Sequence, residues 1–184
     1  MTKTILKLTA VTAIVASMAF AAFDAQAIND TSQITVTVDN TFVLDTPTPL
    51  SFGTIVAIAG AATTSTLAID AAGAPTILNP GAARLVEFAA GNAGQATITG
   101  AAPNTTITVS YSSPVTLTCS VAPCTGTTPE FTVGTFVDDV AGVVTTDLAG
   151  AATINFGATL TTEASAVPYE DGLYEGTLTI SAVY

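Results

Sequence analysis

Apolar and polar residues alternate with a period of two along much of this chain. Four runs keep this alternation, at residues 34–39, 66–70, 106–111 and 115–119, and they are rich in β-branched side chains. The pattern predicts strands that lay one face on a core and turn threonines to solvent. The apolar positions are Ile34, Val36 and Val38; Leu67 and Ile69; Ile107, Val109 and Tyr111; and Val115, Leu117 and Cys119.

Turn-forming residues separate these runs, and helical periodicity is nearly absent. Pro80-Gly81, Pro114 and Gly142 are typical of the glycines and prolines that fall between alternating segments. Residues 79–87 are the best helical candidate, but the segment is short and contains a glycine, so no helix is expected there. The spacing of the turn signals predicts an all-β fold, a sandwich or barrel of many short strands.

The clearest alternating run is the C-terminal one. It predicts one strand from residue 174 to residue 184, with its apolar face on the core. Losing two or three of its core-facing side chains would cost several kcal/mol, at about 1.5–3 kcal/mol each. The predicted apolar face holds Tyr174, Gly176, Leu178, Ile180, Ala182 and Tyr184.

The first 27 residues have the organisation of a secretory signal peptide. Lys3 and Lys7 precede an apolar run of 16 residues at 8–23, and Ala25-Gln26-Ala27 places small residues before the expected cleavage point. The alternative, a transmembrane anchor, is disfavoured because a spanning helix needs about 20 residues. Cleavage would leave residues 28–184, which is 184 − 27 = 157 residues and suits one domain. No membrane span is expected after cleavage.

The charge balance restricts the partners of the mature chain. Arg84 would be its only basic side chain, against 13 carboxylates, which is 14 minus Asp24. Such a surface repels phosphate backbones, so nucleic acid is not an expected partner. Charged residues are only 9% of the chain, against about 25% in ordinary soluble domains. Low charge weakens the repulsion between copies and therefore favours association. Arg84 itself is expected to pair with Glu87 or a cross-strand acid, or to be exposed.

Cys119 and Cys124 are the only cysteines. Export implies an oxidising compartment, so we expect these two to form a disulfide that staples a local turn. Closing so short a loop would contribute about 2 kcal/mol. A redox role is disfavoured because the spacer is longer than the usual two residues and no base lies nearby.

The residue types needed for catalysis are scarce. Histidine is absent from the sequence, so serine triads and imidazole-ligated zinc sites are not expected. The acid doublets Asp138-Asp139 and Glu170-Asp171 could serve a glycosidase or calcium, but adjacent acids in a strand face opposite sides and both doublets lie near predicted turns. We therefore expect a protein that is not an enzyme and that uses no cofactor or metal.

Several segments together resemble an exported bacterial family, domain-of-unknown-function family 4402. They are residues 50–56, 82–88, 156–160 and 171–184, the last being the strongest. The terminal motif is also similar to the end of spore-coat-U-type and archaic chaperone–usher pilin subunits. The resemblance implies an immunoglobulin-like antiparallel β-sandwich, a fibre or surface role, and no catalytic residues. It places the motif at Gly172, Tyr174, Gly176, Leu178, Ile180 and Tyr184.

These expectations combine into a structural role. The leading hypothesis is a non-catalytic pilus subunit or surface-matrix component outside a Gram-negative cell, exported through the periplasm, which self-associates by edge-strand pairing. A periplasmic chaperone and usher are possible partners, as is another surface protein. Residues 28–40 would be a donor strand with Ile34, Val36 and Val38 as knobs, or else the first strand of their own sheet. The alternative hypothesis is a monomeric secreted adhesin or glycan-binding module with an aromatic-lined patch.

Overall fold

The computed structural model describes residues 35–36, 41–121, 123–124 and 128–184, and this part of the chain contains strands and turns but no helix. All strand pairs are antiparallel, and the strands belong to one compact unit, Asp39–Tyr184. The all-β, antiparallel, sandwich-like fold expected from the sequence is confirmed. The strands are β1 (Val43–Thr48), β2 (Thr54–Ile58), β3 (Thr66–Ile69), β4 (Pro75–Leu78), β5 (Arg84–Ala89), β6 (Gly94–Thr99), β7 (Thr106–Tyr111), β8 (Val115–Cys119), β9 (Phe131–Asp138), β10 (Val143–Thr145), β11 (Ala152–Thr162), β12 (Tyr174–Glu175) and β13 (Ile180–Val183).

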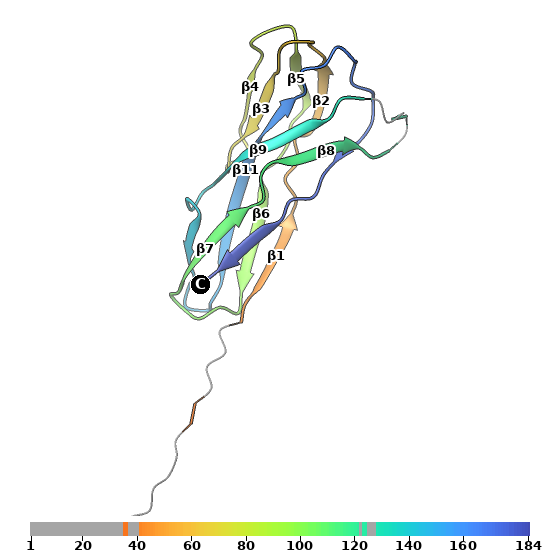
Figure 1. Cartoon of the computed structure of the whole chain (residues 1–184). Helices are drawn as coiled ribbons and strands as arrows, with labels where there is room; N and C mark the ends of the chain where they lie inside the picture. The colour runs from red at the N-terminus through yellow and green to blue at the C-terminus, as the bar shows by residue number, and fades with distance from the viewer. Residues whose placement is uncertain (1–34, 37–40, 122, 125–127) are drawn as a thin grey trace, which may run out of the picture. The chain divides into compact units, whose positions relative to one another are not determined.

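The longest strand, β11, organises the larger sheet (Figure 1). One of its edges pairs first with β6 and then with β3, while its other edge pairs with β9. The change from β6 to β3 occurs at Gly157, where a Cβ atom would lie 1.9 Å from the backbone oxygen of Ile69. Only glycine allows this close approach. The sheet order is β1-β6-β11-β9-β8-β12, with β3 and β4 branching from β11.

A three-stranded sheet, β10-β7-β13, covers one part of the larger sheet. Between them lies the first core cluster, which consists of the buried residues Ala96, Ile98, Ala101, Ile107, Val109, Val144, Ile154 and Phe156. The alternation predicted for residues 106–111 is confirmed, because Ile107 and Val109 are buried and their threonine and serine neighbours are exposed.

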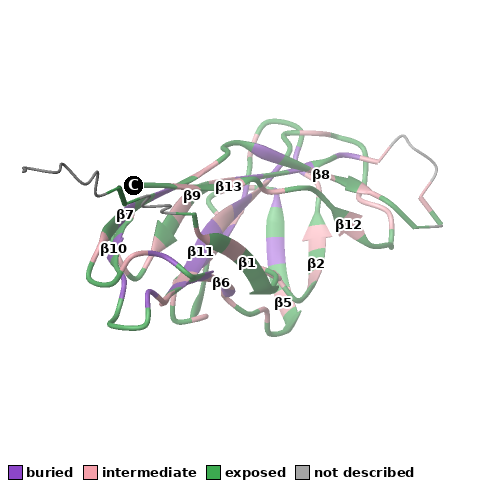
Figure 2. Ribbon diagram, turned by 90° about the horizontal axis from the view of Figure 1, so that it is seen from below, coloured by how far each residue is buried: buried purple, intermediate pink, exposed green. Residues whose placement is uncertain are grey.

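A two-stranded ribbon of β2 and β5 covers another part of the molecule. Its inner face packs Ile55, Ala57 and Leu85 against the second core cluster. This cluster consists of Leu67, Leu85, Val115, Phe131, Val133, Ala158 and Leu160. Figure 2 shows the buried positions of β11 along the middle of the molecule, between more exposed strands. The strand β11 thus contributes to both clusters and joins them.

Candidate functional site

The C-terminal motif forms two strands that belong to different sheets. The strand β12 pairs with β8, and β13 pairs with β7. The prediction of one continuous strand from 174 to 184 is therefore wrong, since residues 176–179 lie outside both strands. The cause is the crossing at Gly176, where a Cβ atom would lie 2.4 Å from the backbone oxygen of Thr116. The chain passes so close to β8 here that a side chain has no room.

The apolar side chains of the motif nevertheless stay on the core side after the break between β12 and β13. Leu178, Ile180 and Ala182 all pack against the first core cluster, yet each is only half-buried. At the N-terminal end of the motif, the Tyr174 hydroxyl bonds Thr128 Oγ1 at 2.7 Å and donates to the Glu170 carbonyl at 3.1 Å. The alternation of the sequence therefore predicted the packing face correctly, although the strand is interrupted.

The strand β13 is an edge strand. Its only strand partner in the described part of the chain is β7, so its other edge has no neighbour there. The strand β1 is likewise paired only with β6. Phe42, just before β1, meets Tyr184, just after β13, edge to face with ring centroids 5.2 Å apart. We call β1 and β13 the open edges; in Figure 1 their arrows run in opposite directions.

The two open edges differ in how well they could accept another strand. The β1 edge carries Asp45 and Pro47, and its register shifts between Asp45 and Thr48. Charge, proline and irregular register are features that block pairing at sheet edges. The β13 edge, Ile180-Ser181-Ala182-Val183, has a regular register and neither charge nor proline. Of the two, β13 is the edge that can form a new ladder of backbone hydrogen bonds.

The cysteine pair lies beside the start of the C-terminal motif, where Cys119 pairs with Tyr174. Cys119 and Cys124 form a disulfide, with Cα atoms 5.9 Å apart, a normal span for this bond. A Cβ atom on Gly172 would lie 2.7 Å from the sulfur of each cysteine. The Leu173 carbonyl accepts from the Ser120 backbone N–H at 2.7 Å. The disulfide loop and the Gly172 segment therefore pack directly on each other.

The N-terminal predictions fall mostly outside the described residues. The signal peptide at 1–27 lies there entirely, as do Ile34 and Val38 of the candidate donor strand. Thr35 and Val36 are described; they are not in a strand, and Val36 is 85% exposed. The donor and own-sheet interpretations of residues 28–40 both stay predictions. No helix in the described part of the chain is long and apolar enough to cross a bilayer.

The acid doublet Asp138-Asp139 splits between two surroundings, as the strand geometry predicts. Asp138 Oδ1 accepts from the backbone N–H groups of Val140 and Gly142 at 3.1 and 2.8 Å. Asp139 accepts instead from Asn155, from its backbone N–H at 3.0 Å and from its side-chain amide at 2.7 Å. Both carboxylates thus stabilise local structure. No cluster of three or more metal-ligating side chains occurs among the described residues.

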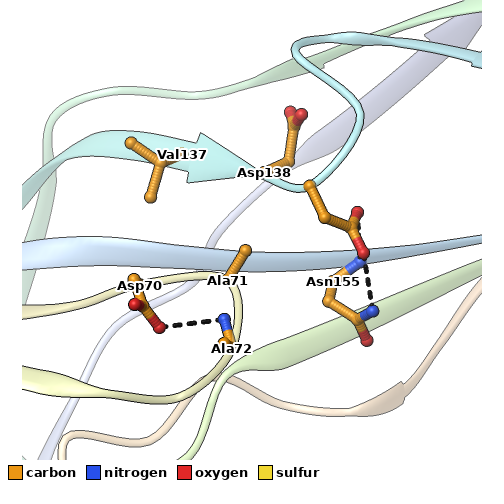
Figure 3. A pocket seen from close by; sticks show the side chains of 7 residues that line it. Asp70, Ala71, Ala72, Val137, Asp138 and Asn155 are labelled. Carbon is orange, nitrogen blue, oxygen red and sulfur yellow. Dashed lines mark hydrogen bonds between the residues drawn. The ribbon is translucent and has the colours of Figure 1, made fainter.

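Figure 3 shows an open depression beside this doublet, with a volume of about 520 Å³. Three aspartates line it together with small apolar side chains, and no aromatic residue contributes to the lining. The lining residues are Asp70, Ala71, Ala72, Val137, Asp138, Asp139 and Asn155. We call it the acidic depression.

A turn motif that the sequence analysis missed accounts for several of the acids. In Asp70-Ala71-Ala72-Gly73-Ala74 the Asp70 Oδ1 accepts from the backbone N–H groups of residues 72 and 74, at 2.9 and 2.8 Å. In Asp147-Leu148-Ala149-Gly150-Ala151 the equivalent distances are both 2.8 Å. Both glycines have positive φ, 84° and 73°. The recurring Asp-x-Ala-Gly-Ala was the signal that could have revealed these turns.

Arg84 is exposed and makes no ion pair with any described residue. The expected pairing with Glu87 is wrong, because residues three apart in a strand point to opposite faces. Glu87 Oε1 instead lies 3.4 Å from the backbone N–H of Gly91. The other interpretation, an exposed arginine, agrees with the structure.

Tyr111 has the most strongly shifted pKa among the described residues. Its ring stacks on Phe136, with centroids 5.4 Å apart, and its hydroxyl is buried. Burial raises the pKa of Tyr111 far above its ordinary value of 10.0, and the Asp138 charge raises it further. Asp138 is near enough to act on Tyr111, but the hydroxyl makes no hydrogen bond of good geometry with any described group. Tyr111 therefore stays protonated and serves packing.

Together, the antiparallel sheets and the core clusters that they cover define an all-β, sandwich-like domain. Residues 42–184 match the model of a domain of unknown function, DUF4402. This match covers all of the strands, and the chain belongs to that family. Comparison with curated proteins and with solved structures gives no match. The resemblance seen in the sequence is thus confirmed at the level of the family.

Proposed function

We propose that this protein is a non-catalytic structural subunit of an extracellular fibre or surface matrix, and that copies join by edge-strand pairing. The observation that carries the proposal is that β13 has an open edge and that its inward side chains are only partly covered. Leu178, Ile180 and Ala182 pack on the first core cluster but are only partly buried. A strand added beside β13 would bond its free backbone groups and could shield these side chains.

The strand that we propose as the donor is the segment 28–40 of another copy. Ile34, Val36 and Val38 alternate with polar residues, so all three can face the same side of an added strand. Burying three such side chains contributes several kcal/mol, at about 1.5–3 kcal/mol each. Export through the periplasm, and assistance there by a chaperone and an usher of the kind that serves pilins, belong to the same proposal.

The glycan-binding alternative receives less support. It expects a concave patch lined by aromatic rings, whereas the acidic depression has none in its lining. Several aromatic side chains in the described part of the chain pack together instead; Phe131, for example, stacks on Tyr169 with centroids 4.4 Å apart and meets Tyr174 at 4.9 Å. No feature of the described surface favours this function over assembly.

The test places matched charges on the two open edges. Ser181→Lys puts a lysine on the outward face of β13, and Thr46→Lys puts one on β1, where pairing is already blocked. Both positions are exposed, so both variants should fold. In the exported full chain, purified from the periplasm, Ser181→Lys should weaken assembly about tenfold, while Thr46→Lys should assemble like the wild type.

A second pair of variants tests the donor segment. Val36→Asp changes a predicted knob, and Thr37→Asp changes its outward neighbour. We expect only Val36→Asp to reduce polymers, measured by size-exclusion chromatography and electron microscopy. Equal assembly of Ser181→Lys, Val36→Asp and the wild type would reject edge-strand pairing.

A further inference from the structure

The outer face of the β2–β5 ribbon is apolar although nothing in the described part of the chain covers it. Val56, Ile58 and Val86 are each about half-exposed, and Phe88 is 81% exposed. Val56 and Val86 are directly paired across the two strands, and Ile58 is paired with Arg84. We call these five residues the ribbon face.

The sequence of the ribbon is unusual for a strand pair with one face in water. Residues 55–58 are apolar without interruption, and Leu85, Val86 and Phe88 fall on both faces of β5. Strands that are apolar on both sides are typical of strands buried on both sides. The second core cluster covers only the inner face. The pattern therefore indicates an interaction partner for the outer face.

The distribution of charge on the chain indicates which surface could bind the ribbon face. The mature chain would carry a net charge of 1 − 13 = −12, so any contact between two copies must overcome repulsion. Arg84 is its only basic side chain, lies on the ribbon face and has no ion-pair partner among the described residues. A contact between copies that joins a basic side chain to a carboxylate must therefore use Arg84. Two ribbon faces meeting each other would place arginine near arginine, which is unfavourable.

The acidic depression is the complementary surface. Its lining includes Ala71, Ala72 and Val137, and Val137 is 44% exposed, so it offers apolar contact. Asp70 and Asp139, also in the lining, provide negative charge. The ribbon face has the opposite combination, with the exposed ring of Phe88 and the cation of Arg84 on the same face of β5, on either side of Val86. We infer that the ribbon face of one copy docks, through Phe88 and Arg84, into the acidic depression of a second copy.

This contact would join two different surfaces of the same chain. Such head-to-tail contacts repeat from copy to copy and produce rings or filaments instead of closed pairs. None of its residues belongs to β1 or β13, so the contact is separate from the proposed edge-strand pairing. It would supply a second connection between subunits.

A charge swap tests the contact without disturbing the aspartates that stabilise turns. Arg84→Glu reverses the cation, and Ala72→Lys adds a cation at an exposed position in the depression. Each should weaken self-association of the exported full chain about tenfold, measured by sedimentation velocity at fixed ionic strength. The double variant carries both substitutions and sets an acid on the ribbon face against the new lysine in the depression, so its association should be at least about threefold stronger than that of either single variant. Thr76→Glu, on exposed β4, controls for added negative charge and should have no effect.

The outcomes separate this contact from its alternatives. If Arg84→Glu weakens association but Ala72→Lys does not, the ribbon face binds something other than the depression, such as residues 28–40 or its own copy, and the inference is wrong. Failure of the double variant to recover also overturns it. If Ser181→Lys weakens association and Arg84→Glu does not, the proposal of edge-strand pairing is supported and the proposed contact between the ribbon face and the depression is rejected. If Arg84→Glu weakens association and Ser181→Lys does not, the contact is supported and edge-strand pairing is rejected.

Discussion

Phe42 and Tyr184 meet edge to face, with ring centroids 5.2 Å apart, and so connect the beginning of β1 with the end of β13. The contact links the larger sheet to the three-stranded sheet without a backbone hydrogen bond between these two strands. Edge-to-face geometry is a favourable arrangement for aromatic rings. The pair therefore holds the two open edges together at one end.

Removing the ring of Tyr184 should lower the free energy of unfolding. We expect Tyr184→Ala to cost about 1–2 kcal/mol, since it loses the ring pair and a half-buried apolar surface. Tyr184→Phe should cost less than about 0.5 kcal/mol, because the hydroxyl lies a long 3.4 Å from the Ala102 backbone N–H. Urea denaturation measures both values. Equal losses would show that the hydroxyl, and not the ring, matters.

The crossing at Gly176 should not tolerate a side chain. In Gly176→Ala the new Cβ would lie 2.4 Å from the Thr116 carbonyl oxygen, a backbone atom held in β8. We expect a loss of about 1–3 kcal/mol, as for other overpacked sites. Gly134→Ala is the matched control, because its Cβ would meet only Ser113 Oγ, at 3.5 Å. Its effect on the thermal midpoint should be near zero or slightly positive.

The stability of the two Asp-x-Ala-Gly-Ala turns should depend on the side-chain oxygen of the aspartate at the first position. Asp147→Ala leaves the N–H groups of Ala149 and Ala151 without their acceptor, and we expect a loss of about 1–3 kcal/mol. Asp147→Asn keeps one acceptor oxygen and should lose about half as much or less. Asp45→Ala, where the carboxylate accepts only from the adjacent Thr46, should stay within about 0.5 kcal/mol of the wild type. If Asp45→Ala is as costly as Asp147→Ala, the turn explanation is wrong.

Tyr111 should make the protein sensitive to alkaline pH. Its pKa is raised in the folded state, so the unfolded chain loses this proton first as the pH rises past 10.0. The folded state binds more protons there, and the free energy of unfolding must fall with increasing pH. Below that pH the stabilisation is complete. Tyr111→Phe should reduce the fall and, by removing a buried hydroxyl without a partner, should be neutral or stabilising at about pH 7. Unfolding curves at neutral and at alkaline pH measure both effects.

Local alternation correctly predicted the strands that pack one face on the core and expose the other. Leu67 and Ile69 in β3, and Ile107 and Val109 in β7, are buried as expected, because a period of two decides which face of a strand meets the core. The disulfide of Cys119 and Cys124 is also present, as the sequence predicted from the spacing of the two cysteines and from the expected export.

Other features depend on neighbours that are distant in sequence. The division of the C-terminal run into β12 and β13 depends on the approach to Thr116, which alternation alone does not reveal. The ribbon of β2 and β5 could not be predicted from the sequence either, because Ile55-Val56-Ala57-Ile58 has no alternation that separates an inner from an outer face. For the candidate site, the sequence indicated the residues of β13, but only the sheet order shows that this strand has a free edge.

The position of β11 among its partners has a consequence for the time course of folding. Leu160 pairs with Leu67 and Ile154 pairs with Ala96, so both halves of the core require chain segments that are far apart in sequence. Contacts of this kind form slowly, since a long loop must close before any packing rewards it. Until β11 arrives, β3, β6 and β9 lack the strand that joins them. A newly made chain therefore passes through a period in which many backbone groups could pair with the wrong neighbour.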